Sequence, residues 1–241
     1  MADGDIRSYL ALAERITDAW RFKCLKDVAA ALAQLHGVGV AHQDTKPSNV
    51  MHFEIDEISK MGDFGSATGQ ILPHPNLNDF TVFGDPHYSP PELLYAFRSS
   101  EWGEGRLAVD LYHLGNLIFF LFGYGNATAD LVDRMPIGMR PRSCQGGWHG
   151  DFKTVLPYLE HAFNVMITEF NSHMSERLGP EIATSLTDLA RQLCRPNPAR
   201  RGHRLNRASR QNPYGLERFV SEFDLLANKA GRLRNFGPAA A

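Results

Sequence analysis

Residues 42–49 read His42-Gln43-Asp44-Thr45-Lys46-Pro47-Ser48-Asn49, and residues 63–65 read Asp63-Phe64-Gly65. In the first stretch a Lys follows the Asp by two residues and an Asn follows it by five, while a second Asp stands fourteen residues after that Asn. Transfer of a phosphoryl group needs a carboxylate that accepts a hydroxyl proton, and an Asn and a carboxylate that hold magnesium on nucleotide phosphates. The spacing therefore predicts a site for phosphoryl transfer.

Each polar side chain of this pattern has a role that its chemistry fits. The Asp44 carboxylate is the candidate catalytic base, and the Lys46 ammonium can neutralise charge that develops on the transferring phosphate. Asn49 and Asp63 supply hard oxygen ligands for Mg²⁺, which takes few protein ligands and shares the rest with phosphate and water. Gly65 is expected to let the backbone turn sharply beside this metal site.

Composition and charge indicate one soluble globular domain. The chain has 241 residues and a net charge of −2, which allows a single hydrophobic core. Its three cysteines are widely spaced and suggest no disulfide framework, which fits a reducing cytoplasm. No signal peptide is visible. The longest apolar stretch, residues 107–122, is interrupted by polar side chains and short for a membrane span, so it predicts a buried helix.

Helical spacing of apolar residues dominates, and we predict a mainly α fold with one small β-hairpin. A first helix is expected to include Ile6, Leu10, Leu12 and Ile16. Short apolar runs at 50–53 and 58–61 predict the hairpin, which presents Asp63. The remaining predictions are a helix over 25–35 that Gly37 and Gly39 close, a functional loop at 65–90, a short helix after Pro91, helices at 152–178, 181–194 and 213–226, and a frayed tail at 238–241.

The two motifs resemble the catalytic loop and the magnesium loop of eukaryotic-type serine/threonine protein kinases, with the His-Gln-Asp variant found among bacterial kinases. The resemblance implies that residues 1–241 form the C-terminal lobe of a protein kinase domain without the N-terminal lobe. The implied parts are a hinge-like start at 1–5, a catalytic loop at 42–49, an activation segment at 63–92, and an irregular segment with an inserted helix at 135–180.

Downstream landmarks extend the resemblance. Residues 84–92 read Gly84-Asp85-Pro86-His87-Tyr88-Ser89-Pro90-Pro91-Glu92, similar to the end of a kinase activation segment. Residues 197–201, Asn197-Pro198-Ala199-Arg200-Arg201, resemble the late Asp-Pro-x-x-Arg motif of the family. The resemblance implies that Arg201 pairs with Glu92 as a structural ion pair, and that Asp110 braces the backbone of the catalytic loop.

The resemblance also assigns residues around the nucleotide. Met51 would form the floor under the adenine, and Phe64 would stack on His42, which is interpreted as a buried packing residue. The implied activity is transfer of the γ-phosphoryl group of ATP, with Mg²⁺, to a hydroxyl of a protein substrate. In this family the nucleotide lies between two lobes, and the glycine-rich loop, strand Lys and helix Glu of the small lobe have no counterpart in this sequence.

The missing elements predict a partner. The chain could be a fragment, a truncated reading frame or a solitary large lobe, and a small lobe would be needed in cis or in trans. The face that would meet it is expected to expose Met51, Phe64 and apolar neighbours, which predicts a partner protein, dimerisation or poor solubility.

Two residues depart from the family pattern. Gln43 stands where the family has an Arg that binds a phosphate on the activation loop, so that bidentate anchor is absent. Asp85 replaces a Thr that bridges the catalytic Asp and Lys. Its carboxylate could pair with Lys46, select basic substrates, or raise the pKa of Asp44 by like-charge repulsion.

The sequence favours three other functions less. A non-catalytic kinase-like interaction or regulatory module would fit the missing phosphate loop, but the motif residues that carry chemistry are all present, which favours an enzyme. A small-molecule phosphotransferase is disfavoured by Glu92, the long activation segment and the late Arg. The arginines between residues 195 and 210 are interpreted as a solvated face rather than a nucleic-acid site, because net basic charge and interleaved aromatics are lacking.

Overall fold

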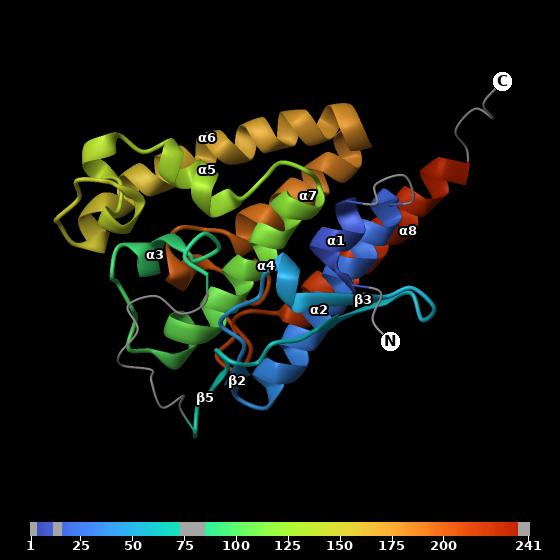
Figure 1. Ribbon diagram of the computed structural model, residues 1–241, viewed down its shortest axis with the longest axis horizontal. Coiled ribbons are helices and arrows are strands. Elements are labelled where there is room, and N and C mark those ends of the chain that lie inside the picture. Colours follow the sequence, from blue (N-terminus) through green and yellow to red (C-terminus); the bar gives the residue numbers. More distant parts are fainter. Residues whose placement is uncertain (1–3, 12–15, 73–84, 236–241) are drawn as a thin grey trace.

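The computed structural model describes residues 4–11, 16–72 and 85–235, with side chains as far as residue 232. The fold is mainly helical, with two small antiparallel sheets (Figure 1). The helices are α1 Ile6–Ala11, α2 Asp18–Gly37, α3 Pro91–Leu94, α4 Ala108–Leu121, α5 Ala127–Asp133, α6 Phe152–Leu178, α7 Pro180–Leu193 and α8 Leu216–Asn235. The strands are β1 Gly4–Asp5, β2 Val40–Ala41, β3 Val50–Phe53, β4 Ile58–Met61 and β5 Thr68–Gly69.

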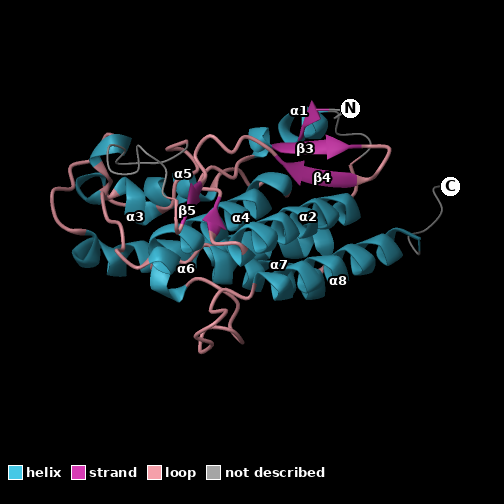
Figure 2. Ribbon diagram, turned by 90° about the horizontal axis from the view of Figure 1, so that it is seen from below, coloured by secondary structure: helices cyan, strands magenta, loops and turns pink. Residues whose placement is uncertain are grey.

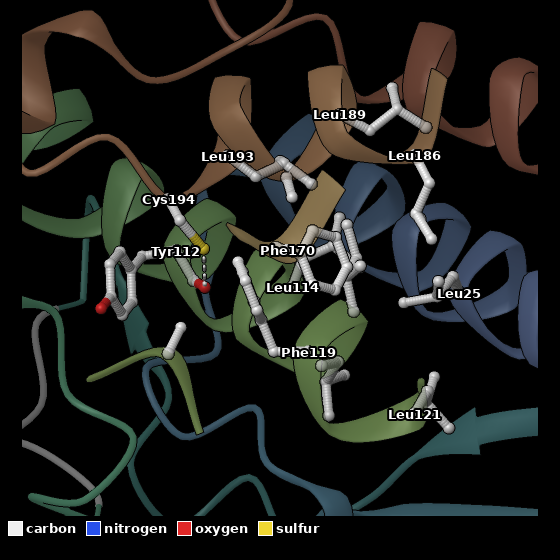
Figure 3. Close-up of a cluster of buried hydrophobic side chains, with 14 of the residues drawn as sticks. Leu25, Tyr112, Leu114, Phe119, Leu121, Phe170, Leu186, Leu189, Leu193 and Cys194 are labelled. Carbon is white, nitrogen blue, oxygen red and sulfur yellow. Dashed lines mark hydrogen bonds between the residues drawn. The ribbon is translucent and has the colours of Figure 1, made fainter. Parts of the chain in front are cut away.

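Helix α4 runs through the centre of the hydrophobic core, and nearly all of its residues are buried. Figure 3 shows its side chains meeting those of α2, α6 and α7. The rings of Phe119 and Phe170 lie with centroids 4.6 Å apart, and the Cys194 thiol donates to the Tyr112 carbonyl at 3.6 Å. The buried helix predicted for residues 107–122 is thus confirmed. Among the helices that the structure describes, none is long and apolar enough to cross a membrane.

Two pairs of helices enclose this core: α2 packs along α8, and α6 packs along α7 (Figure 1). Helix α2 begins at a cap in which the Thr17 hydroxyl accepts from the Trp20 amide at 3.0 Å. It ends at Gly37, before the left-handed Gly39 (φ +71°). Gly179 (φ +80°) separates α6 from α7, as the sequence predicts. Residues 135–150 form an irregular connection that contains two 3₁₀ turns.

The predicted hairpin is confirmed with its bounds, since β3 pairs with β4 in the register Val50↔Met61 to Phe53↔Ile58. The hairpin lies against the helices with β4 on α2 (Figure 2). Two further pairings were not predicted: β1 adds to β3, with Gly4 opposite His52, and β2 pairs with β5. Strands of two residues are too short to show a hydrophobic period, which is why the pattern missed them.

Two predicted helices have other limits in the structure. The described part of the first, α1, covers Ile6–Ala11; Leu12 lies outside the described residues, and Ile16 is not helical, because the next residue, Thr17, is extended as the cap of α2. The last helix begins at Leu216 instead of Pro213, because Gly215 has φ +59°, which a right-handed helix does not accommodate. It continues to Asn235, beyond the predicted end at residue 226. The predicted tail at 238–241 and residues 73–84 of the predicted loop lie outside the described residues.

Candidate active site

Asp110 of α4 holds the backbone at the start of residues 42–49, the predicted catalytic loop. Its fully buried carboxylate accepts from the amide of His42 at 2.8 Å through Oδ2 and from the amide of Gln43 at 2.7 Å through Oδ1. His36 Nε2, from the last turn of α2, donates to Oδ2 at 2.9 Å. Burial works to raise the pKa of Asp110, but the bonds and charge of His36 and the Gln43 amide outweigh it and lower that pKa. The ionised carboxylate therefore fixes the two residues before Asp44.

Gln43 is turned into the protein. Its backbone is left-handed (φ +67°), and its side chain is almost fully buried. Its Nε2 donates to the carbonyl of Arg106 at 2.9 Å, within the π-helical segment Gly103–Leu107 that precedes α4. From the sequence, Gln43 was notable only because it replaces an Arg that would bind phosphate. In the structure its side chain joins the predicted catalytic loop to this π-helical segment.

The structure brings Asp44, Lys46 and Asn49 together around one carboxylate. The buried Asp44 accepts through Oδ2 from Lys46 Nζ at 2.9 Å and from Asn49 Nδ2 at 3.0 Å. Asn49 Nδ2 also donates to the Asp44 carbonyl at 2.8 Å, which closes the loop on itself. The backbone amide of Asp85 donates to Oδ1 at 3.1 Å. The predicted base is thus held on both oxygens.

Asp63 follows the β-hairpin and lies beside Asn49, because the amide of Gly62 donates to the Asn49 carbonyl at 2.8 Å. The Asp63 side chain is exposed, and within the described ranges its carboxylate accepts a single hydrogen bond, from the Gly65 amide at 3.2 Å. The sharp turn expected at Gly65 is made by Asp63 itself, which has φ +56°. Asp tolerates this left-handed conformation better than most residues do.

The donor groups at Asn49 and Asp63 fit a magnesium ion. Asn49 Nδ2 donates both of its bonds to Asp44, so the other end of the amide, Asn49 Oδ1, is turned away from that carboxylate. The Ser48 hydroxyl donates to Asn49 Oδ1 at 3.2 Å. An amide oxygen and a carboxylate are hard ligands of the kind that Mg²⁺ takes. In the ranges that the structure describes, no group of three or more His, Cys, Asp or Glu residues gathers around a common point. A magnesium ion here would take its other ligands from water and phosphate.

His42 and Phe64 connect the two motifs through their rings, whose centroids lie 5.1 Å apart at 57°. His42 is fully buried, and its Nε2 donates to the Gly62 carbonyl at 3.1 Å while its Nδ1 accepts from the Asp44 amide at 3.3 Å. Phe64 remains 52% exposed. The His42 ring is therefore buried, whereas about half of Phe64 is open to solvent.

Asp85 binds His87 through its carboxylate. Oδ1 accepts from the His87 amide and from its Nδ1, both at 3.0 Å. Partial burial works to raise the pKa of Asp85, but the bonds from His87 and the charge of Lys46 outweigh it and lower that pKa. The sequence allowed an ion pair between Asp85 and Lys46, but in the structure Lys46 pairs with Asp44.

A buried ion pair joins the end of the predicted activation segment to the segment that precedes α8. Arg201 donates from Nη1 and Nη2 to the two carboxylate oxygens of Glu92, each at 2.6 Å. Its Nε donates to the Arg195 carbonyl at 2.7 Å, and its guanidinium lies 4.8 Å from the ring centroid of Tyr112. Both charged side chains are buried, so the pair connects α3, α4 and the segment before α8.

Comparison with known proteins assigns the family. The family model for the protein kinase domain matches residues 1–205. The chain belongs to the protein kinase family. The braced loop around Asp44 and the exposed Asp63 are therefore parts of a kinase domain.

Several serine/threonine kinases are similar to this kinase chain. The serine/threonine-protein kinase DCLK1 of Rattus norvegicus is 30% identical over 145 residues, 56% of this chain and 31% of that protein. The serine/threonine-protein kinase ELM1 of Saccharomyces cerevisiae is 27% identical over 233 residues, 89% of this chain and 34% of that protein. An Aurora kinase of Debaryomyces hansenii is 31% identical over 121 residues, 50% of this chain and 27% of that protein. The chain thus spans about a third or less of these relatives.

Met51 lies on the face of the kinase hairpin that points away from the core. In β3 the buried residues are Val50 and His52, whereas Met51 and Phe53 are only partly buried. Its neighbours across the sheet are Lys60 of β4 and Asp5 of β1. Met51 is therefore partly open to solvent, as Phe64 is. Its contact with adenine stays a prediction.

Two histidines near the kinase site escaped the sequence reasoning. His36 bonds Asp110, 74 positions further along the chain, and His87 bonds Asp85. No local pattern identifies a partner at the distance of the first pair. The pair of Asp85 and His87 lies within one short Asp-Pro-His stretch, but such residues are typical of a turn and do not indicate a specific bond.

Proposed function

We propose that this chain is the catalytic C-terminal lobe of a protein serine/threonine kinase, which transfers the γ-phosphoryl group of ATP to a protein hydroxyl with Mg²⁺. The observation that carries the proposal is the arrangement around Asp44, whose carboxylate is held by Lys46 and Asn49 and bordered by Asp63. The similarity to relatives named as serine/threonine kinases supports the choice of a serine or threonine hydroxyl.

In the proposed reaction Asp44 orients the substrate hydroxyl and accepts its proton as the oxygen attacks the γ-phosphorus, while the bond from that phosphorus to the β–γ bridging oxygen breaks and ADP leaves. The carboxylate needs no reorganisation, because hydrogen bonds already hold both oxygens. The Lys46 ammonium, 2.9 Å from Asp44 Oδ2, is close enough to neutralise charge on the transferring group. Asn49 and Asp63 would hold the Mg²⁺, which when bound neutralises phosphate charge. Met51 is proposed to contact the adenine.

We also propose that activity requires a small lobe, supplied in cis or in trans. A largely apolar hollow of about 560 Å³ lies beside Phe64, between α2 and β4. Its apolar lining includes Ala31, Leu35, Val38 and Met61. Val38 and the ring of Phe64 are exposed, and exposed apolar surface of this kind favours a protein partner. Light scattering after size exclusion tests this: a chain that stays monomeric at high concentration would count against self-association on this face.

The decisive experiment is a calorimetric titration of Mg·ATP into the chain. Binding of micromolar strength is expected, lost in Asp63→Ala and retained in Asp56→Ala, a matched change at an exposed Asp in the turn of the same hairpin. Binding that survives Asp63→Ala would contradict the metal role of this residue. Absence of binding to the unaltered chain would show that the lobe alone is inactive.

The second candidate is a non-catalytic kinase-like module that binds and regulates a partner. The hollow beside Phe64 is the observation that favours it. If Mg·ATP does not bind, even with a small lobe added, the hollow would remain the functional surface. If Phe64→Ser still binds Mg·ATP but no longer self-associates, the nucleotide site and the hollow beside Phe64 are separate surfaces.

A further inference from the structure

The loop of residues 203–214, which precedes α8, carries a serine between two arginines. The backbone amide of His203 donates to the Tyr214 carbonyl at 2.9 Å and closes the loop at its base. Within the loop, residues 207–211 read Arg207-Ala208-Ser209-Arg210-Gln211. Ser209 is half-buried, and the other four of these residues are exposed. The loop therefore presents this serine at the surface of the protein.

Few bonds hold Ser209 in place. Its amide donates to the Asn206 carbonyl at 2.7 Å, and its Oγ accepts from the amide of Asn212 at 3.2 Å. Within the described residues the hydroxyl donates to no acceptor. The oxygen thus keeps its proton and a lone pair for reaction, and the short stretch around it can open locally without disturbing the core.

Arg207 and Arg210 bring two positive charges to this hydroxyl. Arg207 precedes Ser209 by two residues and Arg210 follows it directly, so the chain itself keeps both near it. The two arginines and Asn212 line one cavity of about 750 Å³. In the ranges that the structure describes, neither guanidinium forms a hydrogen bond or an ion pair. Both are therefore available to an anion on Ser209.

The carboxylates that line the same cavity do not neutralise these arginines. They belong to Glu101, Glu104 and Glu217. Glu104 accepts from the Ser99 hydroxyl at 3.0 Å, and Glu217 accepts from Asn212 Nδ2 at 2.6 Å. Among the described residues none of the three forms an ion pair with either arginine of the loop.

Positive charge is also crowded around Arg207. Partial burial lowers the pKa of Arg207, and the charges of Arg195 and Arg200 lower it further, whereas the Asp188 carboxylate works to raise it. An anion added beside Arg207 would relieve the repulsion between these guanidiniums.

We infer that Ser209 is a phosphorylation site, and that Arg207 and Arg210 bind the phosphate once it is attached. A phosphoserine carries a charge of about −1.5 to −2 at neutral pH and three strong acceptor oxygens. Each guanidinium offers parallel N–H groups that match two such oxygens. The amide of Asn212, which now donates to Oγ, is a third donor at the same place.

ATP is the phosphoryl donor of this modification. Ser209 Oγ attacks the γ-phosphorus and forms an O–P bond, while the bond from that phosphorus to the β–γ bridging oxygen breaks and ADP leaves. The hydroxyl proton passes to the catalytic carboxylate of the kinase that acts on the loop.

A second copy of this chain is the kinase that the charges favour, an assignment that rests on the proposed function. The amide of Asp85 donates to the proposed base Asp44, and the lowered pKa of Asp85 keeps its own carboxylate ionised at neutral pH. A negative charge beside Asp44 complements a serine that arginines flank.

The binding of the phosphate is tested without any phosphotransfer, by genetic insertion of phosphoserine at position 209 of the full chain. The second pKa of a free phosphoserine is about 6. In ³¹P NMR it is expected to fall to about 5.5 or below, because two guanidiniums stabilise the dianion. Arg207→Gln and Arg210→Gln should each return it towards about 6.

Phosphoserine at Ser172 is the matched control. Ser172 is exposed on α6, three residues after Glu169 and four before Glu176, so its phosphate should titrate at about 6 or above. A phosphate at position 209 that titrates like this control, or that is insensitive to both Arg→Gln variants, would overturn the binding by Arg207 and Arg210.

The acceptor role is tested with the unaltered chain in Mg·ATP, alone and with an added serine kinase that selects serines preceded by arginine. Tandem mass spectrometry should find phosphate on Ser209 and none at position 209 in Ser209→Ala. Absence of phosphate on Ser209 in both arms would overturn the site.

The same assay identifies the kinase. Phosphate that appears in Mg·ATP alone, is lost in Asp44→Asn and forms faster per chain at higher chain concentration would support the second copy. Phosphate that forms only with the added kinase would support the site and overturn the second copy as its kinase. Failure of the proposed kinase function and failure of the Ser209 site are therefore distinguishable.

Discussion

The two motifs that make up the candidate site differ in how the chain holds them. Asp44 and Asn49 are buried and hydrogen-bonded to each other, and Asp110 fixes the backbone in front of them from the central helix. Asp63 and Phe64 are exposed and extend from the end of a short hairpin. The first motif is therefore positioned by the core, whereas the second depends on a few local contacts.

Under the proposed kinase function, the difference would match two separate roles within one site. A base must be held in a productive geometry before substrate arrives, and a buried network supplies that rigidity. A metal ligand that shares its ion with phosphate and water can be completed when they bind. The effect of substitutions on stability should therefore decrease from the core-held motif to the exposed one.

The largest loss of stability is expected when the buried ion pair is broken. Arg201→Met leaves the Glu92 carboxylate buried without its bidentate partner, and should lower the free energy of unfolding by about 3–5 kcal/mol. Glu92→Gln should have a similar effect. Urea denaturation of both single variants and the double variant would measure the coupling, and the double variant should lose less than the sum of the two. A loss below about 1 kcal/mol in both single variants would show that the core does not depend on this pair.

Asp110→Asn should follow, with a loss of about 2–3 kcal/mol at neutral pH, because amide bonds to a charged acceptor are removed from a buried site. The folded pKa of Asp110 is lowered, so its contribution is complete above the unfolded value of about 3.9 and is lost as the pH falls through the folded pKa. The stability difference between the unaltered chain and the variant should thus narrow below about pH 4. Asp56→Asn, at an exposed Asp, is the control and should run parallel to the unaltered chain.

The elements with a long hydrophobic pattern could be predicted from the sequence. Residues 152–178 and the hairpin at 50–53 and 58–61 have the bounds that apolar spacing indicated. What could not be predicted depends on partners far along the chain. Gly4 becomes a strand residue only because His52 offers its backbone, and two residues carry no period that could reveal this.

The same limit applies to the site. Residue types and spacing were enough to nominate Asp44, Asn49 and Asp63, because their chemistry is local to two motifs. The bond from Gln43 to the Arg106 carbonyl joins positions 63 residues apart and has no counterpart in any short pattern. The turn at Asp63 was assigned to Gly65 because glycine is the usual left-handed residue, but Asp also adopts this conformation.

Phe64→Ala should cost about 1 kcal/mol, well below the 3–5 kcal/mol typical of a buried Phe, because half of the ring is already in solvent. Ile55→Ala, at a residue that is 96% exposed, is the control and should change stability very little. Both would be measured by urea denaturation at two protein concentrations. A larger, concentration-dependent loss in Phe64→Ala would mean that a second copy covers the ring.

The smallest effect on stability is expected at Asp63, where the comparison between the two motifs becomes sharpest. Asp63→Asn keeps a residue that tolerates φ +56° and removes charge from an exposed side chain, so the free energy of unfolding should change by no more than about 0.5 kcal/mol. If Asp63 holds Mg²⁺, the affinity for Mg·ATP should nevertheless fall by about tenfold or more. Urea denaturation and calorimetric titration of the same preparation would separate the two effects. A stability loss as large as that of Asp110→Asn would show that the magnesium loop is also braced by the core, and that the two motifs are held alike.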